Sequence, residues 1–184
     1  MASLAKGPPI TIEQYESFEG YPGLRDELIH GEIVMSPQPK PFHQQVSDNV
    51  RALLDEAIRH QPYVARQNTN IKFGQAHSMP APDVFIVGRD AWKRACQLDE
   101  YLSQAPLLVV EVVSPANRRA RVEEKARLYL SQGVAMVWIV YPKRKVVLVH
   151  RAGQDAAIER TPAHLLELPD PLVAEIPVQG FFVI

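Results

Sequence analysis

The chain has 184 residues, of which 46% are hydrophobic and 22% are charged, and its formal net charge at pH 7 is −1. This length and composition predict one globular domain, and the balanced charge excludes a globally basic protein, so any surface for nucleic acid has to be local. The single cysteine, Cys96, excludes an intramolecular disulfide and a zinc site built from cysteines. Because we find no membrane-spanning segment and no apolar leader, we expect a cytoplasmic protein.

Apolar spacing and turn residues predict the elements of the first half of the chain. Val46, Val50 and Leu54 recur at helical spacing, which predicts an amphipathic helix. His30 and Gly31 separate two short apolar runs, which is typical of a tight hairpin. In chain order we expect a loose tail over 1–9, a helix over 12–18 capped by Thr11, a hairpin over 27–35, an extended loop over 36–42, a helix over 43–60, and strands over 63–66, 69–73 and 83–87.

The stretch 106–113, Pro-Leu-Leu-Val-Val-Glu-Val-Val, is the most informative part of the chain. Its β-branched residues predict a strand, and apolar residues at both parities predict a strand buried on both faces. Glu111 is the ionisable residue within it. A buried carboxylate is costly unless it is paired, protonated or bound to a metal. Glu111 is therefore either the partner of an arginine near the strand end or part of a functional site.

The second half of the chain continues the alternation of helices and short strands. We expect a helix over 90–96 and a helix over 118–132 that Asn117 caps and Gly133 terminates. A strand hairpin over 135–140 and 145–150 should follow, and then short strands between proline-rich turns up to residue 184. The sequence contains no internal repeat and no linker. It therefore predicts a single α/β domain over 1–184, with a mixed central sheet flanked by helices.

Four common catalytic motifs are missing from the sequence. It has no GxGxxG after a strand, no GxxxxGK[ST], no HExxH and no GxSxG. This disfavours Rossmann dinucleotide enzymes, P-loop NTPases, zincins and serine hydrolases.

Two predicted strands each carry one acid: Asp83 opens the strand 83–87, and Glu111 lies near the end of 106–113. If the strands are neighbours, the carboxylates converge at one edge of the sheet and repel each other, which raises one pKa. A divalent cation removes the repulsion, because Mg²⁺ binds one or two carboxylates together with phosphate oxygens. Without metal, the repulsion predicts that Asp83→Asn is neutral or slightly stabilising.

Pro82-Asp83 and Glu111 resemble the PD-(D/E)XK signature of restriction-endonuclease-like nucleases. The chain as a whole resembles the Uma-two family of restriction endonucleases. The matching segments span about residues 25 to 150 and are Glu27-Leu-Ile-His-Gly-Glu-Ile-Val-Met-Ser-Pro, His43 at a helix start, Pro82-Asp83-Val, Val110-Glu-Val-Val-Ser-Pro115, Glu124-Lys125 before Leu128-Tyr129, Gly133-Val134 and Trp138-Ile-Val. The resemblance implies a restriction-endonuclease-like core, Mg²⁺ or Mn²⁺ held by Asp83 and Glu111, and nucleic acid, DNA first, as the substrate.

The chain departs from the superfamily pattern at one position. The pattern places a lysine two residues after the glutamate, where this sequence has Val113. Lys125 on the following helix is the nearest replacement. Helical spacing places it at the rim of the inward stripe that Val122, Ala126 and Tyr129 form, from which its long side chain could reach the strand end. The alternative is an ordinary surface lysine; shifted lysines of this kind in the superfamily favour the catalytic role.

Three further residues are possible accessories of the site. Glu27 matches the first acidic position of the family and is either an outer metal ligand or a surface charge of the hairpin. His43 either reaches the site or stabilises a helix start. Arg118 either binds phosphate or belongs to a solvated face. Tyr129 is expected to be a core residue.

We therefore expect a metal-dependent endonuclease, with Asp83 and Glu111 as metal ligands and Lys125 as the catalytic lysine, acting as a homodimer. The alternative is a catalytically degenerate nuclease fold that serves as a nucleic-acid-binding or regulatory module, which Val113 and the near-neutral charge favour. A third possibility is a hydrolase of a small phosphodiester, which a pocket too narrow for duplex nucleic acid would favour.

Overall fold

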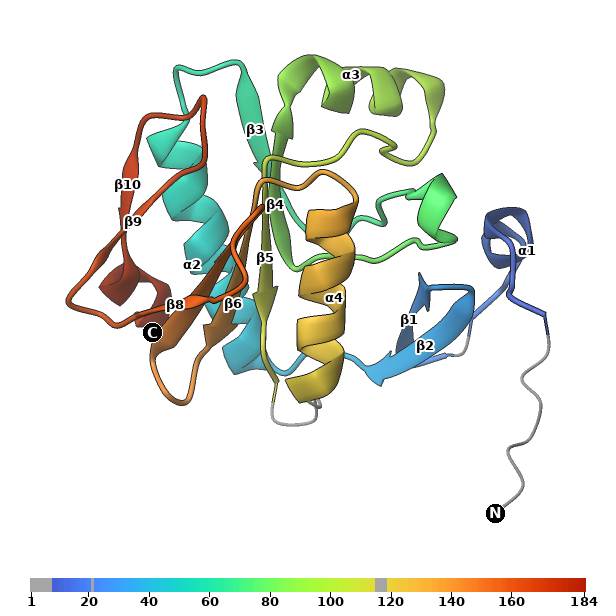
Figure 1. The fold of residues 1–184 in the computed structure, drawn as a ribbon, viewed down its shortest axis with the longest axis horizontal. Coiled ribbons are helices and arrows are strands. Elements are labelled where there is room, and N and C mark those ends of the chain that lie inside the picture. The colour runs from blue at the N-terminus through green and yellow to red at the C-terminus, as the bar shows by residue number, and fades with distance from the viewer. Residues whose placement is uncertain (1–7, 21, 115–118) are drawn as a thin grey trace.

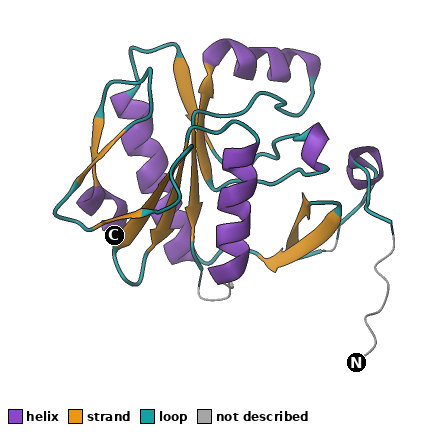
Figure 2. Cartoon of the chain, in the orientation of Figure 1, coloured by secondary structure: helices purple, strands orange, loops and turns teal. Residues whose placement is uncertain are grey.

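The structure, a computed structural model, describes residues 8–20, 22–114 and 119–184. Its centre is a six-stranded sheet (Figures 1 and 2). In spatial order the strands are β3 (Tyr63–Arg66), β4 (Val84–Gly88), β5 (Leu108–Val112), β6 (Met136–Tyr141), β7 (Val146–Arg151) and β8 (Ile158–Arg160). β5 and β6 run parallel, whereas the other neighbouring pairs of this sheet run antiparallel. The predicted α/β fold with a mixed central sheet is confirmed.

Helices cover both faces of this sheet. On one face lies α2 (Pro41–Ala57), whose Val46, Val50 and Leu54 are fully buried in the larger core cluster. The opposite face is covered by α4 (Arg119–Ser131) and α3 (Arg89–Leu98), which pack against the second core cluster. Figure 1 shows α4 in front of the sheet and α2 behind it. The strands between these layers are almost wholly apolar because both of their faces are buried.

The N-terminal region forms a separate unit beside the sheet. It contains α1 (Ile12–Glu16), capped by Thr11, and a hairpin of β1 (Leu24–Ile29) and β2 (Glu32–Pro37), which is its own two-stranded sheet. At the turn, His30 and Gly31 have φ values of 49° and 76°, as a tight two-residue hairpin turn requires. The hairpin meets the body where the Met79 N–H donates to the Leu28 carbonyl oxygen over 2.7 Å.

The C-terminal region closes the core on the α2 face. A second two-stranded sheet pairs β9 (Leu165–Glu167) with β10 (Glu175–Pro177). The short 3₁₀ helix η2 (Val178–Phe182) follows β10, and a second one, η1 (Gly74–Ala76), lies earlier in the chain, between β3 and β4. Leu166, Ile176 and Phe181 pack into the same cluster as α2. None of the described helices is long and apolar enough to cross a membrane.

Apart from shifts of a few residues at helix and strand ends, two segments differ from the sequence-based expectation. The predicted strand over 69–73 is wrong: this segment makes only isolated bridges, Ile71 to Leu102 and Phe73 to Ser78. The expected loop over 36–42 is shorter, because β2 continues to Pro37 and α2 begins at Pro41, where a missing N–H costs nothing. The expected cap Asn117 and the tail over 1–7 lie outside the described residues.

Candidate active site

The two acids singled out in the sequence lie on adjacent strands. β4 pairs antiparallel with β5, and Val84 is opposite Val110. Carried one residue further, this register places Asp83 opposite Glu111, and opposed residues of antiparallel strands point to the same face of a sheet. Asp83 is 4% exposed and Glu111 8% exposed. The sheet thus brings two buried carboxylates to one edge.

Glu111 lies between two donors on α4. The Tyr129 hydroxyl donates to its Oε1 over 2.7 Å, and the Lys125 Nζ is also 2.7 Å from Oε1. Burial raises the pKa of Glu111 to about 7: the attraction of Lys125 opposes the rise, and the charges of Asp83 and Glu27 add to it. Glu111 therefore keeps its proton to a higher pH than an ordinary glutamate does.

Lys125 joins two carboxylates that come from distant parts of the chain. Besides Glu111, its Nζ contacts Glu27 Oε1 at 2.8 Å and Oε2 at 3.2 Å. Although burial alone would lower the pKa of Lys125, the two carboxylates outweigh it and raise the pKa, so the ammonium form persists. Lys125 is 7% exposed, which excludes the alternative of an ordinary surface lysine.

Glu27 is fixed on its other side by the main chain. Its Oε1 accepts the Ala81 N–H over 2.6 Å, two residues before Asp83, and its side chain is 14% exposed. Glu27 is therefore not the surface charge that its place in a hairpin allows. It ties β1 both to the segment leading into β4 and to α4.

Asp83 faces donors rather than Lys125. Its Oδ2 accepts the Val112 N–H over 2.7 Å and lies 3.3 Å from His43 Nε2, while Arg25 donates to Oδ1 over 3.4 Å. Burial acts to raise the pKa of Asp83, but the hydrogen bond and charge of His43, helped by the Val112 N–H, hold that pKa below its usual value. For His43, burial acts to lower the pKa, and Asp83 more than reverses this.

Of the possible accessory residues, Glu27 and His43 contact this cluster, and Arg118 lies outside the described residues. Sequence reasoning missed Arg25 and assigned Tyr129 to the core alone. The signals were present: Arg25 is two residues from Glu27 on a strand, and Tyr129 is four residues from Lys125 on a helix, spacings that share a face.

The donor chemistry of the cluster suits a hard divalent cation, since Mg²⁺ binds one or two carboxylates and completes its shell with water and phosphate oxygens. Asp83 and Glu111 supply such a pair. Among the described residues, no three His, Cys, Asp or Glu side chains converge as ligands of one ion. The physical reason is visible: Asp83 turns to His43 and Arg25, and Lys125 lies between the other two acids.

Comparison with known proteins identifies the family. Residues 12–182 match the model of the Uma2 family, described as "putative restriction endonuclease". The chain belongs to the Uma2 family. A crystal structure described as "a putative nuclease belonging to DUF820", from Anabaena variabilis, has the same fold, with a TM-score of 0.80 and 20% sequence identity over 95% of this chain and 98% of the other. No protein with a curated description matches the chain. The predicted family and fold are thus confirmed.

Proposed function

We propose that this Uma2 protein is a metal-dependent endonuclease that hydrolyses phosphodiester bonds in nucleic acid, with DNA as the substrate. The observation that carries the proposal is the buried meeting of Glu111, Lys125 and Glu27 beside Asp83. Moving such charges out of water costs roughly several kcal/mol per ion, and apolar residues of similar size would stabilise the fold as well or better. Clusters of this kind gather at functional sites.

Asp83 and Glu111 are the residues that would hold the cation, Mg²⁺ or Mn²⁺, because carboxylate oxygens are the ligands that both ions prefer. When bound, the ion would neutralise charge on the phosphate and lower the pKa of a water. Arg25 and His43 fix the orientation of Asp83. The Tyr129 hydroxyl does the same for Glu111.

Lys125 would supply the positive charge that the superfamily pattern places at residue 113. Its ammonium, held against Glu111 and Glu27, would orient the attacking water and stabilise the negative charge that develops on the phosphate. Glu27 prevents the lysine from relaxing into solvent by holding it with a second carboxylate. Val113 faces the same side of the sheet as Glu111, so a lysine there would point toward this cluster.

The test is cleavage of DNA in the presence of Mn²⁺. We expect the wild type to cleave and Glu111→Gln to lose at least about 10²-fold in rate, the usual effect of losing one preorganised electrostatic group. Glutamine retains an acceptor for Tyr129 and Lys125, so the variant should fold. Glu159→Gln is the matched control, because Glu159 forms an exposed ion pair with Arg144 far along the chain.

A second readout separates the enzyme from the non-catalytic alternative, which Val113 favours. Mn²⁺ at 100 times its Kd should stabilise the wild type by about 2.7 kcal/mol and leave Glu111→Gln unchanged. Stabilisation without cleavage of any nucleic acid would support a metal-bound regulatory module. A wild-type protein that Mn²⁺ does not stabilise and that cleaves no nucleic acid would contradict the proposed function.

The pH dependence of metal binding follows from Glu111. Its pKa of about 7 exceeds its ordinary value of 4.5, so the folded protein keeps a proton that the unfolded chain releases. Its stabilising contribution is full below about pH 4.5 and is lost as the pH rises to about 7. A cation requires the ionised form, so Mn²⁺ affinity should increase through the same range and level off above it. Calorimetric titrations at several pH values check this, and a flat profile would contradict it.

The homodimer and the cytoplasmic location expected from the sequence stay predictions. A dimer would allow two sites to act on two strands.

A further inference from the structure

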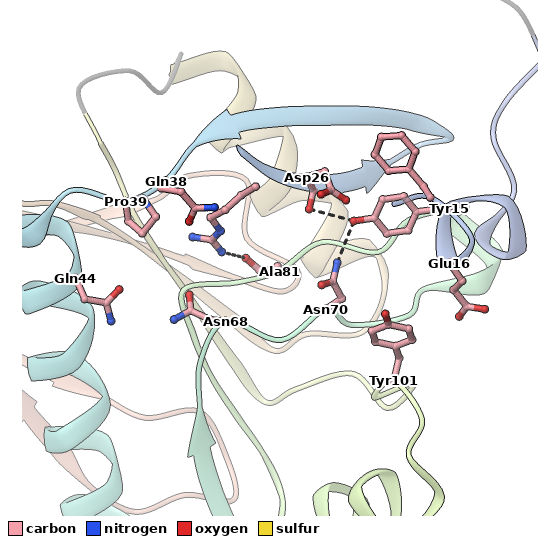
Figure 3. A pocket seen from close by; sticks show the side chains of 12 residues that line it. Tyr15, Glu16, Asp26, Gln38, Pro39, Gln44, Asn68, Asn70, Ala81 and Tyr101 are labelled. Atoms are coloured by element: carbon pink, nitrogen blue, oxygen red, sulfur yellow. Dashed lines mark hydrogen bonds between the residues drawn. The ribbon is translucent and has the colours of Figure 1, made fainter. Parts of the chain in front are cut away.

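A cavity of about 500 Å³ opens beside the carboxylate cluster. Two of its lining residues connect it directly to that cluster: Arg25 donates to Asp83, and the Ala81 N–H donates to Glu27. Figure 3 shows Asn68 and Gln44 toward one end of the cavity and Tyr15 and Tyr101 toward the other. A ligand in this cavity would therefore lie next to the residues proposed to hold the metal.

The end of the cavity nearer the cluster is rich in hydrogen-bond donors. Asn68 is exposed, and its side-chain amide makes no hydrogen bond with the described residues, while its backbone N–H donates to Pro82 over 3.2 Å. Its neighbour Asn70, by contrast, commits its amide to Met79 and Tyr15. Asn68 can therefore donate to sugar or phosphate oxygens. Arg25 donates to Asp83 and to the Ala81 carbonyl oxygen, and its guanidinium has further N–H groups that can do the same.

The other end of the cavity is aromatic. Tyr15 is 8% exposed and donates its hydroxyl to the Asp26 carbonyl oxygen over 3.0 Å, so it is part of the wall. Tyr101 is 47% exposed and has no ring partner among the described residues. An exposed tyrosine on the wall of a cavity is suited to stack against a planar base, which is how single-stranded nucleic acids are commonly bound.

The two ends of the cavity differ in charge. Arg25 is the cation of its lining and donates to Asp83, whereas Glu16 and Asp26 lie with the tyrosines (Figure 3). Glu16 is paired with Lys72 over 2.8 Å. Asp26 has no ion-pair partner among the described residues and disfavours a second phosphate at the aromatic end, so this cavity suits a nucleotide with one phosphate better than a nucleoside diphosphate or triphosphate. A base at the aromatic end with its phosphate toward Arg25 fits the lining.

The size of the cavity decides between a paired and an unpaired substrate. A volume of about 500 Å³ is that of a small-molecule site, so a base has to leave the stack of a duplex before it can enter. We propose that this cavity binds one unstacked nucleotide of single-stranded nucleic acid, adjacent to the phosphodiester that is cut. The proposal rests on the proposed function and narrows its substrate to unpaired strands.

Binding measurements test the proposal without requiring cleavage. Fluorescence anisotropy of a labelled single-stranded DNA, in EDTA with the full chain, is compared with the same sequence as a duplex. We expect tighter binding of the single strand, and a roughly 10- to 100-fold weaker affinity for Tyr101→Ala, as expected for the loss of one base stack. Tyr101→Phe should retain most of the affinity, because the stacking face remains.

A second variant tests the polar end of the cavity, and a third serves as a control. Asn68 has a φ of 53°, a conformation that glycine adopts freely, so Asn68→Gly removes the amide without backbone strain. It should weaken single-strand binding severalfold. Leu165→Ala is the control: Leu165 is 52% exposed, similar to Tyr101, but lies on β9, outside this cavity.

The outcomes distinguish this inference from the proposed function. Single-strand binding that depends on Tyr101 and Asn68, without cleavage in Mn²⁺, would support the cavity and overturn the nuclease. Cleavage of duplex DNA that is unaffected by Tyr101→Ala would support the nuclease and overturn the cavity. Binding of a cyclic or linear dinucleotide at this site, with no affinity for longer strands, would also overturn the inference.

Discussion

Lys125→Met is expected to lower the free energy of unfolding by about 3–5 kcal/mol, because it leaves the buried carboxylates of Glu27 and Glu111 without their shared cation. It should also lower cleavage by roughly 10²- to 10⁴-fold at saturating metal. Urea unfolding and cleavage rates below the melting temperature check both parts. Mn²⁺ should restore more stability to this variant than to the wild type, since the ion replaces the missing charge.

Controls separate folding from chemistry. Lys93→Met removes an exposed lysine of α3 and should leave both quantities unchanged. The double variant Lys125→Met with Glu27→Gln should recover part of the stability, because one uncompensated charge is gone, but none of the activity. Adding Val113→Lys to Lys125→Met should restore some cleavage. Cleavage at the wild-type rate by Lys125→Met would contradict the catalytic assignment.

Asp83→Asn is expected to abolish metal-dependent cleavage and to destabilise the metal-free protein by roughly 1–3 kcal/mol. This expectation is the opposite of the one from the sequence, where repulsion between two acids predicts a neutral or stabilising effect of Asp83→Asn. Asp83 has its own donors in Arg25, His43 and the Val112 N–H, and its pKa is lowered, so the ionised form is the stabilising one. Asparagine keeps the acceptor for Val112 but loses the charge that faces His43.

Urea unfolding in EDTA measures this effect. Asp55→Asn is the matched control, because Asp55 pairs with Arg51 on α2 but its side chain is 38% exposed. Loss of the Arg51–Asp55 ion pair should lower the free energy of unfolding by less than about 1 kcal/mol, as for other exposed ion pairs. An Asp83→Asn variant that is as stable as the wild type would show that the donors around Asp83 contribute nothing in solution.

Local patterns in the sequence were sufficient to predict the central strands, the two long helices and the pairing of the acids. The strand around Glu111 is apolar on both faces, and α2 has a continuous apolar stripe, so period and composition agree there. The segment 69–73 was misassigned because an alternating pattern cannot tell a paired strand from a loop whose bridges go to Leu102 and Ser78.

The sequence predicted most members of the candidate site but not their contacts, and it gave no role in the site to Arg25 or Tyr129. Helical spacing placed Lys125 at a rim, whereas in the structure its side chain is buried between Glu27 on β1 and Glu111 on β5. The contact joins residues 98 positions apart, a separation at which spacing carries no information. The same is true of Arg25 and Asp83, which are 58 positions apart.

The strands β1 and β2 pair with each other and not with the central sheet, so this hairpin can separate from the body without breaking that sheet. Its links to the body include the Leu28–Met79 bridge and the side chains of Arg25 and Glu27. Units of this kind open locally at a lower free energy than the global unfolding of a domain. We therefore expect the arrangement of Glu27, Lys125 and Glu111 to be lost whenever the hairpin opens, before the central sheet unfolds.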